Sequence, residues 1–322
     1  MNSQSKTVRL GLSIAAAFLL IIIVIFSIRA LTIKPVYIAV VTTQSNPDYA
    51  DDGAALLNGA QLYVDQINRQ GGVNGHTVKI KVFDDNGKIA DAIRVAQSIA
   101  NDPDIVAVIG HLFSRTSLEA GDVYNQRGVP VITGTASATS LRQNKWYFSV
   151  VSGNDAVGQF LANYSKRFFQ APQNTNVTIV YDRNDPYSSS LVNGFVPPFK
   201  GLGGKVHGIY DLNAENATAT INQIVSAVLG NKPEDTGLIF VASQKNEAQQ
   251  LIVELRRKGI QSPILGGDAL SGASFAQRFS NLPEALASPG YFTNNVYASS
   301  PVIFDSANQD GQKFFNDYKA TY

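Results

Sequence analysis

The chain has 322 residues, of which 44% are hydrophobic and 16% charged, which fits two domains of ordinary size and a globular α/β composition. Its formal net charge of +1 gives no global field for attracting nucleic acid, so we expect no nucleic-acid partner. There is no cysteine and there are only three scattered histidines, so we expect no disulfide, no metal site and no cofactor.

The N-terminal segment contains an uncharged apolar run at residues 10–28. As a helix this run would be about 28 Å long and would just cross a bilayer core. It exceeds the signal-peptide core of about 7 to 15 residues, and no small-x-small cleavage site follows it. The sequence therefore favours an uncleaved signal-anchor over a cleaved signal or a buried soluble helix. The flanking basic residues slightly favour a cytoplasmic location for residues 1–9, with the rest of the chain outside the cytoplasm.

From residue 36 onward, short β-branched runs alternate with longer stretches of helical period. This alternation is typical of βαβ units and of a parallel sheet that is covered on both faces. A first series predicts strands at 36–43, 77–83, 105–109 and 129–133, with helices at 54–69, 88–101 and about 115–127 between them. We expect this series to form one lobe.

A second series predicts helices at 154–169, 187–200, 216–229 and 244–258 and strands at 176–181, 204–210, 237–241 and 262–265. Two such series suggest two sheets with a ligand cleft at the carboxyl ends of their strands. We expect lobe 1 at 36–150, lobe 2 at 151–285 and a return to lobe 1 at 286–322. This last stretch ends inside an amphipathic pattern of aromatic residues, so the sequence looks truncated.

Five stretches follow one another in an order that resembles the leucine/isoleucine/valine-binding protein family. They are NGAQLYVDQINRQGGVNGHTVKIKVFDDN at 58–86, VIGHLFSRTS at 108–117, VPVITGTASATSL at 129–141, IVYDRNDPYSSSL at 179–191 and LGGDAL at 265–270. No single motif is specific by itself, but their order and spacing cover nearly all of residues 36–322. The resemblance implies a two-lobed type I periplasmic-binding-protein fold, each lobe a parallel sheet flanked by helices, here preceded by one transmembrane helix.

Three hydroxyl residues of the first lobe are candidate ligand contacts. Ser114 lies where a strand gives way to a helix, and a hydroxyl beside the free N–H groups of a helix N-terminus can hold a carboxylate. Serine at this position is also common as a helix cap. The resemblance implies that Thr135 offers backbone groups and Ser137 a hydroxyl to the ligand carboxylate, whereas an ordinary turn would use the same residue types.

The second lobe supplies candidates for the other side of the ligand. The resemblance implies that Tyr187 closes over the ligand and that Asp268 pairs with its ammonium group, although an Asp after two glycines is also a common turn residue. Asp268 stands where the family usually has Glu. Gln244 falls near the position of a pocket aromatic, which leaves the ligand identity open. Tyr49, after the first strand, is a further candidate wall residue.

The remaining polar motifs do not indicate an enzyme. There is no nucleophile elbow and no glycine-rich phosphate loop. Asp84 and Asp85 suggest an acid/base pair, but neighbours on a strand point to opposite faces, so they do not readily line one site. His111 is expected to form hydrogen bonds within the protein rather than to bind a ligand.

Two functions fit these observations. The first is an extracytoplasmic solute-binding protein that captures an amino acid or amide by closure of two lobes and delivers it to an ABC transporter permease. The second is a ligand-sensing ectodomain of a membrane-anchored receptor, with a signalling partner in place of the permease. Both place the binding domain in the periplasm or outside the cell.

Overall fold

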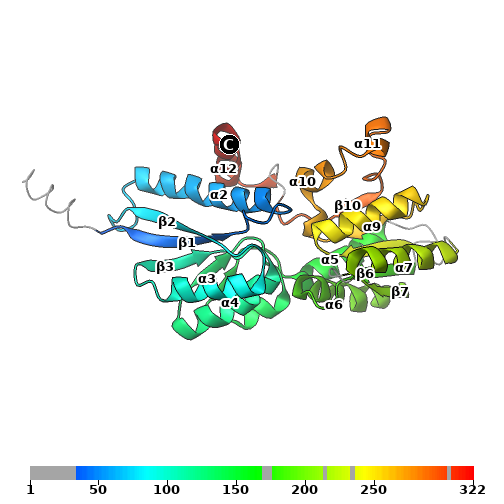
Figure 1. The fold of residues 1–322 in the computed structure, drawn as a ribbon, viewed down its shortest axis with the longest axis horizontal. Coiled ribbons are helices and arrows are strands. Elements are labelled where there is room, and N and C mark those ends of the chain that lie inside the picture. Colours follow the sequence, from blue (N-terminus) through cyan, green and yellow to red (C-terminus); the bar gives the residue numbers. More distant parts are fainter. Residues whose placement is uncertain (1–33, 169–175, 213–215, 233–235, 303–305) are drawn as a thin grey trace, which may run out of the picture.

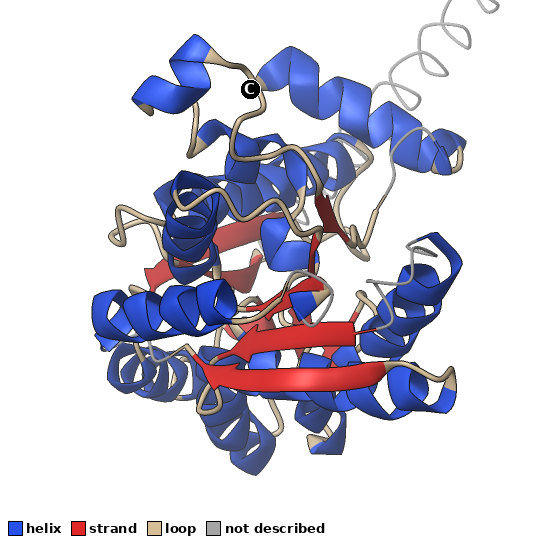
Figure 2. Ribbon diagram, turned by 90° about the vertical axis from the view of Figure 1, so that its right-hand side faces the viewer, coloured by secondary structure: helices blue, strands red, loops and turns tan. Residues whose placement is uncertain are grey.

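The computed structural model describes residues 34–168, 176–212, 216–232, 236–302 and 306–322. They form two parallel sheets that lie side by side, with helices packed on both faces of the strands (Figures 1 and 2). The predicted signal-anchor at 10–28 and the segment 1–9 lie outside the described residues. Within the described part of the chain, no helix combines the length and the apolar character needed to cross a membrane.

The first sheet has the strand order β2-β1-β3-β4-β5, and every neighbouring pair is parallel. Helix α2 lies on one side of it, and α3 and α4 lie on the other (Figure 1). The elements of this lobe are β1 (Val36–Thr42), α2 (Ala50–Arg69), β2 (Val78–Asp84), α3 (Ile89–Ala100), β3 (Ile105–Ile109), α4 (Ser114–Arg127), β4 (Val131–Thr133), the short helix η1 (Thr139–Gln143) and β5 (Tyr147–Ser149).

The second sheet has the order β10-β9-β8-β6-β7 and is also parallel throughout. Its elements are α5 (Asn154–Phe168), β6 (Asn176–Tyr181), α6 (Pro186–Gly201), β7 (Lys205–Asp211), α7 (Ala217–Gly230), β8 (Leu238–Ala242), α9 (Lys245–Arg257), β9 (Ile264–Gly266), η4 (Asp268–Leu270), α10 (Gly272–Gln277), α11 (Pro283–Ala287) and β10 (Val296–Ala298). The last helix, α12 (Gln309–Thr321), contacts α2 of the first lobe.

Strand β8 shows why its sequence is continuously apolar. Leu238, Phe240 and Ala242 pack in one buried cluster with α5 and α6, whereas Ile239 and Val241 pack in another with α7 and α9. Since successive side chains of a strand point to opposite faces, both faces of this sheet need apolar residues. The covered parallel sheet predicted from the sequence is therefore confirmed in this lobe.

Several element bounds differ from those predicted from the sequence. Helix α2 starts at Ala50 instead of 54, because acidic residues in its first turn favour a helix N-terminus. Strand β4 starts at Val131, after Pro130, which has no N–H to give to a ladder. Strands β5 and β10 were not predicted, since both lie at a sheet edge and are largely exposed, so no buried apolar run marks them. Because β10 pairs with β9, the second sheet extends past the expected boundary at 285.

Candidate functional site

A cavity of about 330 Å³ lies between the two lobes, at the carboxyl ends of their strands. We call this cavity between the lobes the main cavity, and its volume falls within the range of about 300–1,000 Å³ that is usual for small-molecule sites. Its walls combine residues from both lobes: Tyr49, Asp52, Ala55, Leu56, Leu112, Phe113, Ser114, Gly134 and Thr135 from the first, Tyr187, Gln244, Lys245, Asp268, Ala269 and Ser271 from the second, and Pro301 from the segment after β10. A molecule in this cavity would contact both sheets at once.

Six of the seven residues proposed from the sequence lie on the wall of the main cavity. They are Tyr49, Ser114, Thr135, Tyr187, Gln244 and Asp268. Each follows or closely follows a strand, and the carboxyl ends of parallel strands meet at one edge of their sheet. This geometry explains how residues more than 200 positions apart in the sequence reach one cavity.

Ser114 is the first residue of α4, yet its hydroxyl does not cap the helix. Its Oγ accepts hydrogen bonds from the backbone N–H groups of Ser137 (3.2 Å) and Ala138 (3.1 Å). The N-cap position is taken by Phe113, which makes no side-chain capping bond. The hydroxyl thus joins the start of α4 to the loop after β4. Thr135 reinforces this junction, because its hydroxyl donates to the carbonyl of Leu112 at 2.8 Å.

Ser137 is the exception among the proposed site residues. Its backbone N–H points to Ser114, and its side chain lines a separate small cavity of about 30 Å³ together with Tyr147 and Gly153. The buried Ser137 hydroxyl makes no hydrogen bond within the described residues. Unlike the other six residues, Ser137 therefore does not line the main cavity in this structure.

On the second lobe, Tyr187 and Asp268 form a hydrogen-bonded pair. The Tyr187 hydroxyl donates to Asp268 Oδ1 (2.8 Å) and accepts from the N–H of Ala269 (3.2 Å). Gly267 permits this approach, because a Cβ there would collide with the Tyr187 hydroxyl. Burial raises the pKa of the Asp268 carboxyl, an effect that the bond from Tyr187 partly offsets. The pair therefore presents an oriented carboxyl group to the cavity.

Gln244 lines the main cavity from the second lobe, and Tyr49 lines it from the first lobe. Gln244 precedes α9, and its Nε2 donates to Asp185 Oδ2 at 3.2 Å. The same carboxylate oxygen accepts from the N–H of Ser188 and so caps α6. Tyr49 is buried and packs edge-on against Phe113, with ring centroids 4.7 Å apart. Tyr49 thus shapes the apolar part of the wall.

An ion pair across the cleft was not predicted from the sequence. Lys245 of α9 places its Nζ 2.7 Å and 2.8 Å from the two carboxylate oxygens of Asp52 in α2. The two residues are 193 positions apart, so no local pattern could have paired them. One sequence feature could have pointed to them. Both residues lie in the first turn of a helix that follows a central strand, β1 or β8, and such turns meet at the cleft.

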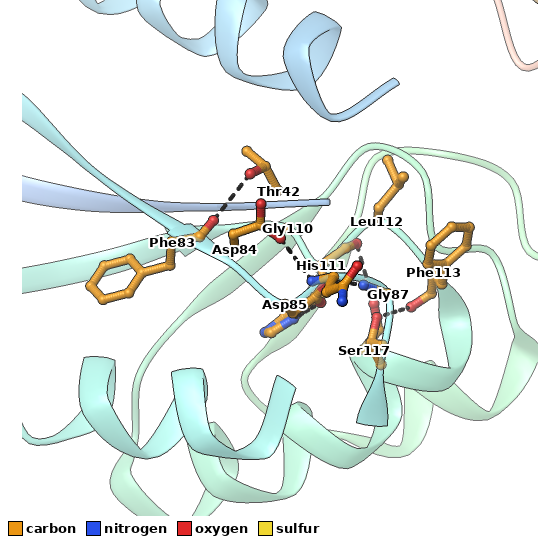
Figure 3. Close-up of polar contacts among 12 residues, drawn as sticks. Thr42, Phe83, Asp84, Asp85, Gly87, Gly110, His111, Leu112, Phe113 and Ser117 are labelled. Atoms are coloured by element: carbon orange, nitrogen blue, oxygen red, sulfur yellow. Dashed lines mark hydrogen bonds and ion pairs between the residues drawn. The ribbon is translucent and has the colours of Figure 1, made fainter. Parts of the chain in front are cut away.

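His111 lies just outside the cavity in a buried network. Its Nδ1 is 2.7 Å from Asp85 Oδ2 (Figure 3), and its Nε2 is 3.1 Å from the Tyr124 hydroxyl. Asp84 turns instead toward the loop after β1 and accepts from the N–H of Ser45 at 2.7 Å. The predictions that His111 bonds within the protein and that the two neighbouring carboxylates do not share one site are confirmed.

The two sides of the main cavity differ in chemistry. The first lobe offers the start of α4 with the hydroxyls of Ser114 and Thr135, and helix N-termini favour anions. The second lobe offers the carboxyl group of Asp268. No group of three or more His, Cys, Asp or Glu in the described ranges is arranged to hold a metal ion. The arrangement suits a small molecule that carries one anionic and one cationic group.

Comparisons with known proteins agree with this geometry. The family model described as periplasmic binding protein matches residues 35–322. The Leu/Ile/Val-binding protein of Escherichia coli K12 is 26% identical over 282 residues, which cover 86% of this chain and 73% of that protein. The substrate-binding protein LivJ of Streptococcus pneumoniae, solved with isoleucine, has a TM-score of 0.75 at 22% identity and covers 89% of this chain and 77% of its own. The leucine-binding protein LivK of Thermotoga maritima has a TM-score of 0.73 at 19% identity, and the match covers 89% of this chain and 76% of LivK.

Proposed function

The chain belongs to the periplasmic binding protein family, and we propose that it captures a free amino acid outside the cytoplasm and delivers it to an ABC-type importer. The curated relatives are named for binding leucine, isoleucine and valine, and the solved relatives include transporter substrate-binding proteins. None of these names describes a signalling receptor, so the sensory alternative gains no support. Binding and release, rather than turnover, are the proposed chemistry.

The observation that supports this function best is the complementarity of the main cavity to a zwitterion. The α-carboxylate of an amino acid would lie at the start of α4 beside Ser114 and Thr135. Its ammonium group would lie against Asp268, which is fixed by Tyr187 at 2.8 Å. Since the two groups are held by different lobes, binding would favour approach of the lobes.

Isothermal titration calorimetry on the full chain tests this proposal. We expect at least one L-amino acid to bind, and we expect its analogue without the amino group and its analogue without the carboxylate to bind much more weakly. Each analogue keeps the side chain and lacks one charged group. The loss of affinity therefore measures recognition of that charge and not burial of the side chain. If a folded chain binds none of the common amino acids, the proposed function is wrong.

We also propose that residues 10–28 anchor the chain to the membrane. Support comes from the length and apolar character of this run, which suffice to span a bilayer core. Alkaline carbonate extraction of membranes, followed by mass measurement of the retained protein, tests the anchor. We expect the uncleaved chain in the pellet. A soluble protein shortened near residue 30 would show that the segment is a cleaved signal.

A further inference from the structure

The main cavity has a second polar region besides the groups assigned to the ligand's charged ends. Asp52 and Lys245 lie on its wall, and their ion pair joins the two lobes. The Lys245 side chain is 14% exposed and that of Asp52 is 29% exposed, so solvent screens the pair only in part. A bound molecule would therefore contact both charges directly.

The hydrogen-bonding capacity of this pair is only partly used. The Lys245 ammonium group is occupied by the two oxygens of Asp52 and by Ser274 Oγ at 3.4 Å. An ionised carboxylate can accept about four hydrogen bonds. Asp52 accepts only from Lys245 among the hydrogen bonds found within the described residues. Asp52 can therefore accept further bonds from a ligand.

Charge balance restricts what that ligand can be. Three charged side chains line the main cavity, namely Asp52, Lys245 and Asp268. An amino-acid ammonium group neutralises Asp268, and the neutral donors beside Ser114 hold the carboxylate. The remaining two side chains neutralise each other, and a charged ligand side chain placed beside them would meet a like charge at close range, Lys245 if it is basic and Asp52 if it is acidic, in a partly dry site.

An apolar ligand side chain is disfavoured for a different reason. If it packed against Asp52, the free acceptor positions of the carboxylate would lose water and gain no hydrogen bond. The first lobe still provides Leu56, Leu112 and Phe113, which suit a short methylene stem. The walls thus combine apolar surface near the stem with a polar end.

From this arrangement we infer that Asp52 and Lys245 determine specificity and select an amino acid whose side chain ends in a neutral carboxamide or hydroxyl group. This inference rests on the proposed amino-acid binding and narrows the ligand class. The carboxamide NH2 or the hydroxyl donates to Asp52. Branched aliphatic amino acids of the same size lack that donor and bind more weakly.

Pairs of ligands with equal shape test the inference by calorimetry on the full chain. We expect asparagine to bind at least about tenfold more tightly than leucine, and threonine more tightly than valine. We expect aspartate, which adds a negative charge, to bind at least about tenfold more weakly than asparagine. If leucine binds as well as asparagine, the inference is wrong while the proposed function stands. If no amino acid binds, the proposed function itself fails.

A double variant distinguishes specificity from a merely structural contact between the lobes. Asp52→Leu with Lys245→Met removes both charges and leaves neither partner unpaired. We expect the preference for asparagine over leucine to fall at least tenfold or to reverse. The control is Lys81→Met with Asp102→Leu, which removes a 2.6 Å ion pair that lies within the first lobe and does not line the main cavity. If the double variant weakens both ligands equally, the pair only holds the lobes together and the inference is overturned.

Discussion

The carboxyl group of Asp268 is held under conditions that oppose its ionisation. Burial is the largest cause and raises its pKa above the usual value, while the bond from Tyr187 and the charge of Lys245 lower it by less. A buried acid of this kind is costly to keep charged when the cavity is empty. The cost is offset when an ammonium group lies beside the carboxylate. Asp268 thus favours ligand binding at the expense of the stability of the ligand-free fold.

Replacing Asp268 with Asn should separate these two roles. The amide keeps an oxygen for the Tyr187 hydroxyl but cannot neutralise an ammonium group, so we expect the dissociation constant to rise at least about 30-fold, or about 2 kcal/mol. The ligand-free variant should melt at a higher temperature than the parent at pH 7, because a buried charge is gone. Calorimetry and thermal denaturation measure the two effects. A variant that melts lower and binds normally would contradict both expectations.

The pH dependence of binding should also reflect Asp268. Because its pKa is raised by burial, the carboxylate becomes protonated at a higher pH than the usual value of about 3.9. Affinity should therefore be constant near neutrality and should fall as the pH decreases through this raised pKa, by up to about tenfold per pH unit. Calorimetry at a series of pH values checks the decline. The Asp268→Asn variant should lack it, and a parallel decline in both proteins would assign the effect to another group.

Residue identity at the site was predictable where a side chain follows a strand. Tyr187 and Asp268 were proposed from the family resemblance, and both lie in segments that follow a strand, where the end of a parallel strand fixes the position of the next residues. The direction of a side chain within a turn was not predictable, and Ser137 turned away for that reason. The pairing of Asp52 with Lys245 depends on how the lobes meet, which no local sequence pattern encodes.

At the scale of elements, the loops after β2 and β3 are joined by a buried network. Asp85 accepts from the N–H of Gly87 at 2.8 Å with one oxygen and contacts His111 at 2.7 Å with the other. His111 in turn contacts the Tyr124 hydroxyl in α4. All three side chains are buried, so water cannot replace a lost partner. The network fixes the loop that leads to Ser114.

Asp85→Ala should therefore destabilise the chain by about 3 kcal/mol, since it leaves His111 and the Gly87 N–H without their buried acceptor. Urea denaturation monitored by circular dichroism measures this change. Asp84→Ala is the matched control, because this neighbouring carboxylate accepts from Ser45 and from the Asn86 N–H but is only partly buried, so its removal should cost clearly less than that of Asp85. Equal decreases in the free energy of unfolding of the two variants would show that the buried network contributes no more to stability than the bonds of Asp84.

The predicted elements succeeded where the sequence pattern is long. Helix α9 and strand β8 were placed within about a residue, since their apolar residues repeat clearly and the strand is buried on both faces. Strands β5 and β10 were missed because they are largely exposed and no buried apolar run marks them. Each lies at a sheet edge and depends on pairing with one neighbouring strand rather than on a local preference.

At the scale of the whole molecule, the lobes touch through charged groups beside the main cavity. Arg278, at the end of α10, donates to the carbonyl of Asp48 in the first lobe and to Asn246 Oδ1 in its own lobe. Its guanidinium group also lies over the Tyr49 ring, 5.8 Å from the centroid. Arg278 does not line the main cavity, so it affects binding through the position of the lobes. Such a contact favours the arrangement in which both walls reach the ligand.

Arg278→Ala should shift the ligand-free chain toward a more open arrangement. A contact that exists only when the lobes are close stabilises that state, and its loss weakens binding by up to the same free energy. We expect a larger radius of gyration in small-angle X-ray scattering without ligand, the parental value at saturating ligand, and a dissociation constant about tenfold higher. Arg257→Ala is the control, because its partner Glu284, at 2.7 Å, lies in the same lobe. If both variants leave the radius of gyration of the ligand-free chain unchanged, the prediction is wrong. The contacts across the cleft would then form as a result of closure and would not determine the balance between the open and closed arrangements.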